Sequence, residues 1–521
     1  MLGRLFAQVR ARRDAGARPA PASEAPAHAA TPASAQPDLV LRDWLARDTF
    51  PTYTREQLGA HPQRLRAARI LAQEGDMSAA EQALRQALQD DPASPIDHML
   101  LAEVLYRRGD YAQARHSFDA AMNDTGRIGA RAAAMLAEQA YLRGEYALAG
   151  QLIERAAAVA PAAMSCQIVL GCLQDAQGSH SADGYARALA HFRLAQAARP
   201  ESPLARVHVA TALIRLGALQ EGLSEWVTAE CLGGTYVNRH LCPVWDGRPL
   251  GTDRLLILTH SGYGDVIQFM RFAQHLRARE PRARLGVLIR QPLARLAENM
   301  GLFEHVYGGD MGAADFDWQV SQTHLPLLLG LSLADLQAYQ PYLRVSPPQV
   351  EAAARWLPPR APGKLRVGLR WAGHPGYTDA TRSVALEALR PLFEVAGVEW
   401  ISLAEGDSQG GVPVRDFGLV DVSAHLIDFQ ATAALMCNLD LVIAVDTSAA
   451  HLAGALNLPT WLLARPNPDW RWGGAGTATP WYGSVRVFRH PEGPGLNWDA
   501  VAGAMALALR ERVAARAIGR A

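Results

Sequence analysis

Hydrophobic and polar residues alternate in two different ways along this 521-residue chain. From about residue 62 to 234, apolar residues recur at the three- and four-residue spacing of amphipathic helices. From about residue 255 onward, short continuous apolar runs, typical of strands buried in a parallel sheet, alternate with helical segments. The pattern therefore predicts a helical region followed by an α/β region.

The helical region repeats with a period near 34 residues. Each of five units places a large residue at the turn between two predicted helices, followed by small and large apolar residues at helical spacing. These turn residues are Met77, Tyr111, Tyr146, Tyr185 and Leu219, at intervals of 34, 35, 39 and 34 residues. Helix pairs of this length stack into a solenoid, and the longer interval predicts an inserted loop near 178–183.

A glycine precedes four of these turn residues by two positions, at Gly75, Gly109, Gly144 and Gly217. Glycine suits the left-handed backbone conformation that ends a helix. Together these features resemble the tetratricopeptide repeat over about 170 residues. The resemblance implies a surface that binds peptides or a partner protein, and a spacer or dimerisation arm is the alternative.

The ends of the helical region are set by composition. We expect residues 1–40 to be a disordered, Ala/Pro-rich N-terminus and residues 41–236 to be the tetratricopeptide-repeat domain. Residues 1–13 are basic and fit either a short amphipathic helix at a membrane surface or a frayed terminus. No apolar run approaches the roughly 18 residues of a membrane span. We therefore expect a cytoplasmic protein, peripheral at the inner membrane only if residues 1–13 bind there.

The charge and cysteine content of the chain exclude some functions. Lys and Arg total 51, as do Asp and Glu, so no net charge favours nucleic acid. The five cysteines are odd in number and lack the CxxC spacing of metal sites. This usage fits a reducing compartment, with the cysteines as packing residues.

The α/β region divides into two lobes at a Pro-rich stretch, residues 347–363. We place the first lobe at 237–346 and the second at 347–521, ending in an amphipathic helix. In each lobe a polar, glycine-containing loop follows the first strand. Open α/β sheets bind ligands at this carboxyl end of their strands, so both lobes are predicted to bind one.

The second lobe contains the most informative segment, residues 440–472. Its strand at 441–445 ends at Asp446, Thr447 and Ser448, which are good helix N-cap residues. Backbone N–H groups at such a helix start face a ligand and attract anions. A diphosphate is the kind of ligand that fits this turn.

Three segments, SGYGDVIQFMRF, VGLRWAGHPGYTDATRSVAL and DLVIAVDTSAAHLAGALNLPTWLL, occur in this order along the α/β region. Together they resemble the heptosyltransferase-like glycosyltransferases of family 9, which occur fused to tetratricopeptide repeats in bacteria. The resemblance covers roughly residues 240 to 515. It implies a GT-B module of two Rossmann-like lobes, with the acceptor on the N-terminal lobe and a nucleotide-sugar donor on the C-terminal lobe.

The resemblance also implies catalytic residues in the glycine loop of the first lobe. Asp265 matches the aspartate taken as the general base of the family, beside Gly262 and Gly264. An acceptor hydroxyl that attacks a sugar must lose its proton, and a placed carboxylate can accept it. The alternative is that Asp265 only caps the following helix.

In the second lobe the resemblance implies donor-binding residues. Asp446, Thr447 and His451 match family positions that contact the diphosphate, and Ser448 replaces a glycine common in true heptosyltransferases. We expect Asp446 to be a cap or ribose ligand rather than a phosphate contact. For His451, the alternative is a core or surface histidine.

The loop after the first strand of the second lobe is expected to stabilise the leaving group. Arg382 is the cation predicted to face the diphosphate, and a solvated loop arginine is the alternative. Trp371 or His374 is expected to contact the base or sugar. No DxD pair is evident, so no metal and no cofactor beyond the nucleotide sugar are expected. Trp470 to Trp472 is predicted to be a packing segment, and a face for the sugar or the acceptor is the alternative.

The sequence thus predicts a glycosyltransferase that moves a sugar from a nucleotide sugar to an acceptor, either a protein bound by the repeats or a glycan. Modification of protein is attractive because repeats joined to a GT-B module also describe the protein O-linked N-acetylglucosamine transferases. The alternatives are a lipopolysaccharide or other glycan transferase and a non-catalytic scaffold, because architecture alone does not decide function.

Overall fold

A computed structural model gives the fold. It describes residues 61–64, 67, 77–177, 181–233, 242–309, 315–337, 341–373, 382–404, 414–465, 468–473, 476–490 and 498–518. The chain forms two compact units, one holding the helical region up to Ala212 and the other holding the α/β region from Leu213 onward. The expectations for residues 1–40 and for His374 fall outside the described residues.

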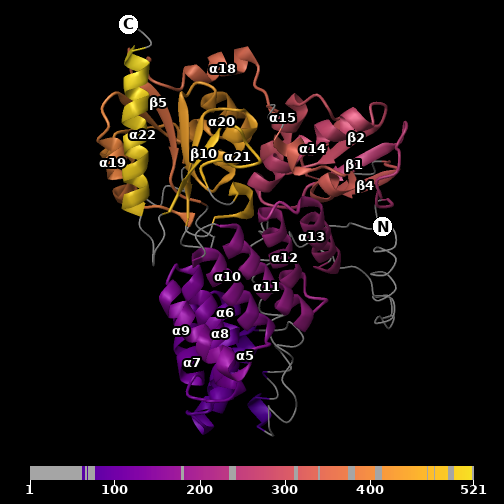
Figure 1. Ribbon diagram of the computed structural model, residues 1–521, viewed down its shortest axis with the longest axis vertical. Helices are drawn as coiled ribbons and strands as arrows, with labels where there is room; N and C mark the ends of the chain where they lie inside the picture. Colours follow the sequence, from indigo (N-terminus) through magenta and orange to yellow (C-terminus); the bar gives the residue numbers. More distant parts are fainter. Residues whose placement is uncertain are drawn as a thin grey trace. The chain divides into compact units, whose positions relative to one another are not determined.

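The first unit consists of paired helices (Figure 1). They are α5 (Met77–Asp90), α6 (Pro95–Arg108), α7 (Tyr111–Ala121), α8 (Arg127–Leu142), α9 (Tyr146–Val159), α10 (Met164–Gln177), α11 (Ala182–Ala198) and the start of α12 (Pro203–Arg215). Within each pair the helices pack closely because alanines such as Ala114 and Ala149 are fully buried between them. Gly109 and Gly144 have φ values of 86° and 76°, as the turn pattern predicted. The helical repeat array is therefore confirmed.

Helix α13 (Leu219–Gly233) continues the repeat pattern but belongs to the second unit. Its residues Leu219 and Leu223 lie in one hydrophobic cluster with Trp245 and Leu255. The predicted boundary at 236–237 thus follows a helix whose apolar face enters the core of the first lobe, whereas the compact unit begins earlier, at Leu213.

The first lobe is a parallel four-stranded sheet in the order β3-β2-β1-β4. Its elements are β1 (Arg254–Leu258), α14 (Tyr263–Arg279), β2 (Arg284–Leu288), α15 (Gln291–Asn299), β3 (His305–Tyr307), β4 (Trp318–Ser321), the 3-10 helix η1 (Gln322–His324), α16 (Leu325–Leu328) and α17 (Leu333–Gln337). The strands β1, β2 and β4 and the helices α14 and α15 match the apolar pattern, whereas β3, η1, α16 and α17 were not expected.

The second lobe is a parallel six-stranded sheet in the order β10-β9-β8-β5-β6-β7. Its strands are β5 (Leu365–Arg370), β6 (Val398–Ser402), β7 (Leu419–Asp421), β8 (Leu441–Val445), β9 (Thr460–Ala464) and β10 (Val485–Arg489). Its helices are α18 (Pro347–Ala354), η3 (Leu386–Leu389), α19 (Arg390–Phe393), η5 (Val414–Phe417), η6 (Ser423–His425), α20 (Phe429–Met436), α21 (Ser448–Ala455), η7 (Trp470–Trp472) and α22 (Trp498–Ile518).

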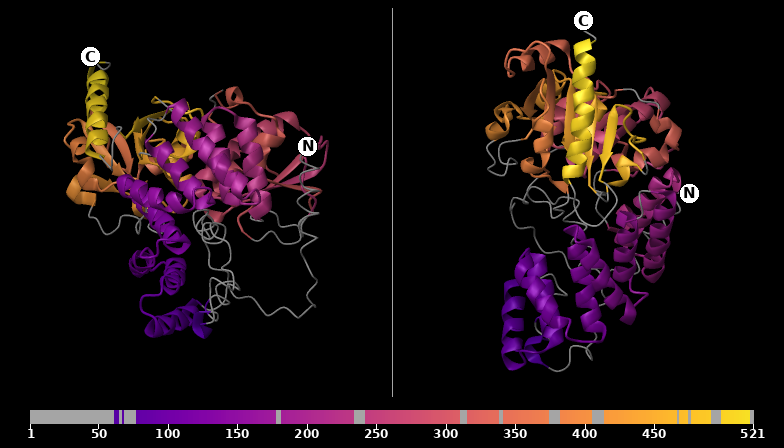
Figure 2. Two further views of the ribbon diagram at one scale, coloured as in Figure 1. Left: turned by 60° about the horizontal axis from the view of Figure 1, so that its bottom comes forward. Right: turned by 60° about the vertical axis from the view of Figure 1, so that its left-hand side comes forward.

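Helices cover both faces of this second sheet. Met505 and Leu509 of α22 share a buried cluster with Leu369 and Ile443 of the strands, and α22 (yellow) lies along the sheet in Figure 2. The opposite strand face, including Val442, packs in the other cluster with residues of α20 and α21. Burial on both faces explains the continuous apolar runs of these strands.

The two sheets share the strand order at which open α/β sheets form a ligand-binding crevice. β1 lies between β2 and β4, and β5 lies between β6 and β8. The strands that follow in sequence are therefore added on both sides of the first strand of each sheet. Ligands of such sheets bind beside this strand, at its carboxyl end. The predicted fold class, a helical repeat array followed by two Rossmann-like α/β lobes, is confirmed. Among the described helices, none is both long and apolar enough to cross a membrane.

Candidate functional site

Asp265 stands at the start of α14, directly beyond β1. The backbone N–H of Gly262 donates a hydrogen bond to Asp265 Oδ2 at 3.0 Å, so the carboxylate caps the start of the helix. The side chain of Asp265 is 23% exposed. The cap that the sequence offered as an alternative therefore exists, and Oδ1 of the same carboxylate makes a further contact.

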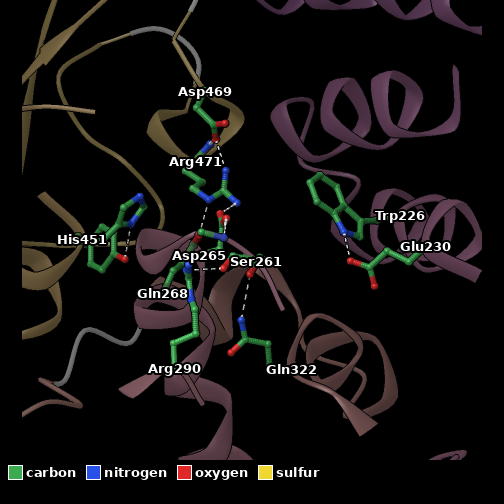
Figure 3. Close-up of polar contacts among 12 residues, drawn as sticks. Trp226, Glu230, Ser261, Asp265, Gln268, Arg290, Gln322, His451, Asp469 and Arg471 are labelled. Atoms are coloured by element: carbon green, nitrogen blue, oxygen red, sulfur yellow. Dashed lines mark hydrogen bonds and ion pairs between the residues drawn. The ribbon is translucent and has the colours of Figure 1, made fainter. Parts of the chain in front are cut away.

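That contact comes from Arg471, in η7 of the second lobe. Its guanidinium donates hydrogen bonds to Asp265 Oδ1, to Asp469 Oδ1 at 2.7 Å and to Gln268 Oε1 at 2.5 Å (Figure 3). Arg471 also lies over the ring of Trp470, 4.2 Å from its centroid. Arg471 therefore joins loops of the two lobes through a nearly buried ion pair.

The charges around Arg471 set the protonation of the cluster. Burial alone would lower the pKa of Arg471, but the charges of Asp265 and Asp469 outweigh it and raise that pKa. Burial would likewise raise the pKa of Asp469, but the charge and hydrogen bonds of Arg471 lower it to about 2. The cluster is thus one cation held between two carboxylates.

Arg471 was missed by the sequence analysis, which predicted packing for the whole segment 470–472. The packing prediction is right for Trp470 and Trp472, which are 4% and 0% exposed. An arginine between two buried tryptophans has to be buried with a carboxylate partner, because a buried charge is costly when unpaired. An arginine between two tryptophans was therefore the pattern in the sequence that could have indicated a buried ion pair at Arg471.

His451 lies where α14 and α21 pack together. A Cβ on Gly264 would lie only 2.6 Å from His451 Cδ2, so the glycine permits this contact. The ring of His451 is buried against Trp472, with Nδ1 2.9 Å from the hydroxyl of Tyr482. Burial, and then the charge of Arg471, lower the pKa of His451 to about 3. His451 is therefore a neutral, buried histidine, and its contact with a donor stays a prediction.

The turn after β8 presents the start of α21. Thr447 is the N-cap residue, but its hydroxyl donates to the carbonyl of Val445 at 3.3 Å and does not cap the helix. Ser448 is half-buried in the first helical position. Asp446 is buried, which raises its pKa to about 6, and its Oδ2 has no hydrogen-bond partner among the described residues.

Arg382 and Asp446 approach one another at the carboxyl ends of β5 and β8. The positive charge of Arg382 partly offsets the effect of burial on the pKa of Asp446. A Cβ on Gly373 would lie 3.6 Å from Arg382 Cδ and 3.9 Å from Thr447 Cγ2, so the three residues meet at one point. This point lies at the carboxyl ends of β5 and β8, where a crevice is expected in a sheet of this strand order.

Trp371 follows directly after β5. It is 4% exposed and lies in a hydrophobic cluster with Leu369 and Val384. The contact of its ring with a base or sugar stays a prediction.

A second buried carboxylate, Glu230 of α13, lies beside the first lobe. It accepts hydrogen bonds from Trp226 Nε1 at 2.9 Å, from Thr323 Oγ1 at 2.8 Å and from His324 Nε2 at 3.0 Å. Burial would raise the pKa of Glu230, but the hydrogen bond of His324 and the nearby histidine charges lower it to about 2. Glu230 was not predicted from the sequence, because its partners Thr323 and His324 are more than 90 positions away along the chain.

Within the part of the chain that the structure describes, no group of three or more His, Cys, Asp or Glu side chains is placed to hold a metal ion.

Comparison with known families identifies the helical repeat. The family model for the tetratricopeptide repeat matches residues 71–138. This chain therefore contains tetratricopeptide repeats, as its sequence predicted. Protein FlbA of Caulobacter vibrioides is 28% identical over 332 residues, which is 58% of this chain and 54% of FlbA. The chain thus spans about half the length of this curated relative.

Two solved structures are similar to the α/β half. A family 9 glycosyl transferase from Veillonella parvula is 11% identical, with a TM-score of 0.38 over 51% of this chain and 98% of that chain. The ADP-heptose heptosyltransferase II of E. coli is 15% identical, with a TM-score of 0.35 over 50% of this chain and 99% of that chain. Identities and scores this low leave the function to be argued from the residues of the chain.

Proposed function

We propose that this protein is a glycosyltransferase that binds a nucleotide-sugar donor at the crevice of its second lobe and an acceptor at the crevice of its first. The ion pair between Arg471 and Asp265 carries the proposal, because it joins the ligand-binding loops of two separate Rossmann-like sheets. A site shared by two such crevices suits a transfer between two substrates.

The donor diphosphate would lie at the start of α21. The N-terminal N–H groups of this helix attract anions, and neither Thr447 nor Ser448 adds a negative charge there. Arg382 would neutralise the charge that develops on the departing diphosphate. The orphaned oxygen of Asp446 would accept a hydroxyl of the ribose or the sugar, because a buried acceptor without a partner is costly.

Asp265 enters the proposal at the junction of the lobes. Its role as the general base, implied by the family resemblance, stays a prediction. In the structure its two oxygens accept from the Gly262 N–H and from Arg471, so it also orders the loop and the junction. Replacing it with asparagine tests both roles.

The acceptor is proposed to be a protein held by the tetratricopeptide repeats. A repeat array joined to a two-lobed α/β module supports this choice over a free glycan. The proposal places the reaction in the cytoplasm, in keeping with five free cysteines. Under this proposal Arg382, rather than a metal ion, stabilises the charge on the leaving group. Adding a chelator should therefore leave the activity unchanged.

Binding and turnover with a panel of nucleoside diphosphates and nucleotide sugars test the proposal. Calorimetry of the wild type should identify one preferred nucleoside diphosphate. Arg382→Ala should weaken its binding by about 10- to 100-fold, because a charge-assisted contact contributes about 1.5–3 kcal/mol. Arg510→Ala, which removes an exposed arginine of α22, is the matched control. A wild type that binds and turns over nothing in the panel would favour a non-catalytic scaffold instead.

A further inference from the structure

Helix α13 contacts both lobes of the α/β unit. On the first lobe, Gln220 Nε2 donates to the carbonyl of Pro326 at 3.2 Å and to that of Leu331 at 2.6 Å. On the second lobe, the ring of Trp226 packs against that of Trp470, with 5.8 Å between the centroids and 61° between the planes. The last helix of the repeat pattern therefore joins the two lobes, and its contact with the second lobe is at η7.

The indole of Trp226 is oriented by the first lobe. Its Nε1 donates to Glu230 Oε1 at 2.9 Å, about one turn further along α13 (Figure 3). Glu230 Oε2 in turn accepts from Thr323 Oγ1 and His324 Nε2 of η1. A buried carboxylate that meets donors on both of its oxygens is held firmly in place. The ring that contacts the second lobe therefore takes its orientation from the first.

Trp470 connects Trp226 to the cation between the lobes. The ring of Trp470 is 4% exposed and packs edge-on against Trp226 and against Trp481, whose centroid is 5.2 Å away. The guanidinium of Arg471 lies over the same ring, 4.2 Å from its centroid. Closely packed side chains shift when a neighbour is removed. Truncation of Trp226 should therefore let Trp470 move, and with it the guanidinium.

The three hydrogen-bond contacts of Arg471 differ in what such a shift does to them. Asp469 lies two positions away in the same loop, so its contact moves with the guanidinium. Asp265 and Gln268 belong to α14 of the first lobe, so their contacts depend on where η7 is held. A planar fork of donors that meets acceptors on both lobes tolerates little displacement. A shift of Trp470 would therefore release the first lobe and leave Arg471 paired with Asp469.

We propose that Trp226 is a positioning residue for the transfer reaction, which holds Arg471 against Asp265 through the ring of Trp470. This inference rests on the proposed glycosyl transfer, because Trp226 maintains the alignment of the two loops that bind the substrates. The donor diphosphate is proposed to lie at α21, within the second lobe alone. Loss of Trp226 therefore lowers the rate of transfer and leaves donor binding intact.

Kinetics separate this role from a merely structural one, with the nucleotide sugar of the panel that the wild type transfers or hydrolyses. Trp226→Ala should lower kcat by about 10- to 100-fold, the effect of misplacing reacting groups by about 1 Å, and should keep the Kd of the preferred nucleoside diphosphate within about twofold of the wild type. Trp226→Phe keeps a ring against Trp470 and should recover most of kcat. An unchanged kcat in Trp226→Ala, or a loss confined to Kd, overturns the proposal.

Trp356→Ala is the matched control. It removes another partly buried indole, which stacks on the ring of His425 at 5.0 Å and packs against the same hydrophobic cluster as Trp226. It should therefore lower the stability of the protein and keep the wild-type kcat. A loss of kcat equal to that of Trp226→Ala would show that any missing indole has this effect, which also overturns the proposal.

A double-mutant cycle tests whether Trp226 acts through Arg471. Arg471→Lys should lower kcat by itself. Adding Trp226→Ala to it should lower kcat little further, because the contact that Trp226 maintains is already lost. Effects on kcat that multiply in the double variant would mean that Trp226 acts elsewhere, and the proposal would then be wrong.

Arginine side-chain NMR tests the positioning without any substrate. The Nε–H of Arg471, which donates to Gln268, is assigned as the resonance missing from Arg471→Lys. Trp226→Ala should shift this resonance and speed its exchange with water, whereas Trp356→Ala should not. An unchanged resonance in folded Trp226→Ala contradicts the proposal whatever the kinetics. A wild type without turnover overturns the proposed function and the kinetic role of Trp226 together, whereas failure of this inference alone is seen only in the variants.

Discussion

Arg471 of the second lobe donates a hydrogen bond to Asp265 of the first, 206 positions away along the chain. The same guanidinium binds Asp469 and Gln268, so one side chain connects the helix start of α14 to the loop after β9. Asp265 also accepts from the Gly262 N–H, so the same carboxylate orders the glycine loop and holds that loop to the second lobe.

Removing Arg471 is expected to destabilise the protein more than removing Asp265. Arg471→Ala leaves Asp469 without its cation and should cost about 3–5 kcal/mol, the range for breaking a buried ion pair. Asp265→Asn leaves Arg471 paired with Asp469 and should cost about 1–2 kcal/mol. Urea unfolding followed by tryptophan fluorescence measures both. Equal losses in the two variants would show that Asp469 does not share the charge of Arg471.

Arg471→Lys is a sharper version of the same experiment. Lysine keeps the positive charge, but its ammonium group lacks the planar fork of donors with which the guanidinium contacts three acceptors. It should therefore recover only part of the stability that Arg471→Ala loses. Full recovery would mean that the charge alone, and not the geometry of the three contacts, holds the junction.

Substitution of Gly264 tests the contact between α14 and α21. Gly264→Ala would place a methyl group 2.6 Å from the ring of His451, which also packs against Trp472. Overpacking of this kind costs about 1–3 kcal/mol. Gly503→Ala, in α22 with nothing within 4 Å of the added Cβ, should be neutral or stabilising, because alanine favours a helix. Relief of the clash by a second substitution, His451→Ala, would confirm that the ring is the obstacle.

Much of the fold follows from local sequence. Continuous apolar runs identified the central strands, and the glycines at 109 and 144 identified turns whose left-handed backbone the structure contains. The loop Asp446 to Ser448 was also recognisable, because a strand followed by cap residues is a local pattern. The short strands β3 and β10 were not predicted, since three to five residues at a sheet edge carry little periodicity.

The site was less predictable because its contacts are distant in sequence. Asp265 and Asp446 were predicted from motifs. No residue close to Asp265 in the sequence indicates its contact with Arg471, and none close to His324 indicates its contact with Glu230 on α13. Trp371 was recognisable as a residue after a strand, but its place in the buried cluster with Leu369 was not, because that cluster also depends on distant residues. Pairing between remote residues depends on the packed fold, and a single sequence does not display it.

His451 is expected to make the stability of the protein depend on pH. Its folded pKa of about 3 lies below its ordinary value, so the unfolded chain binds a proton that the folded chain does not. Stability is then fully present above about pH 6.5 and is lost as the pH falls from there toward 3, by up to about 1.4 kcal/mol per pH unit. His451→Gln should show a shallower decline of the unfolding midpoint between pH 7 and 5 than the wild type. Equal declines of the unfolding midpoint in both proteins would show that water reaches the ring of His451 in the folded protein.

Truncation tests whether α13 belongs to the α/β unit. A chain that starts at Leu213 keeps α13, whereas one that starts at residue 237 exposes the surface against which Leu219 and Leu223 pack. Each buried leucine contributes about 1.5–3 kcal/mol, so the shorter chain should lose several kcal/mol of stability and unfold less cooperatively. The longer one should retain nucleoside diphosphate binding and lose only modification of a protein acceptor. If the chain from residue 237 is as stable as the chain from Leu213, α13 does not stabilise the α/β unit. The contacts of Glu230 with Thr323 and His324 then do not stabilise the first lobe either.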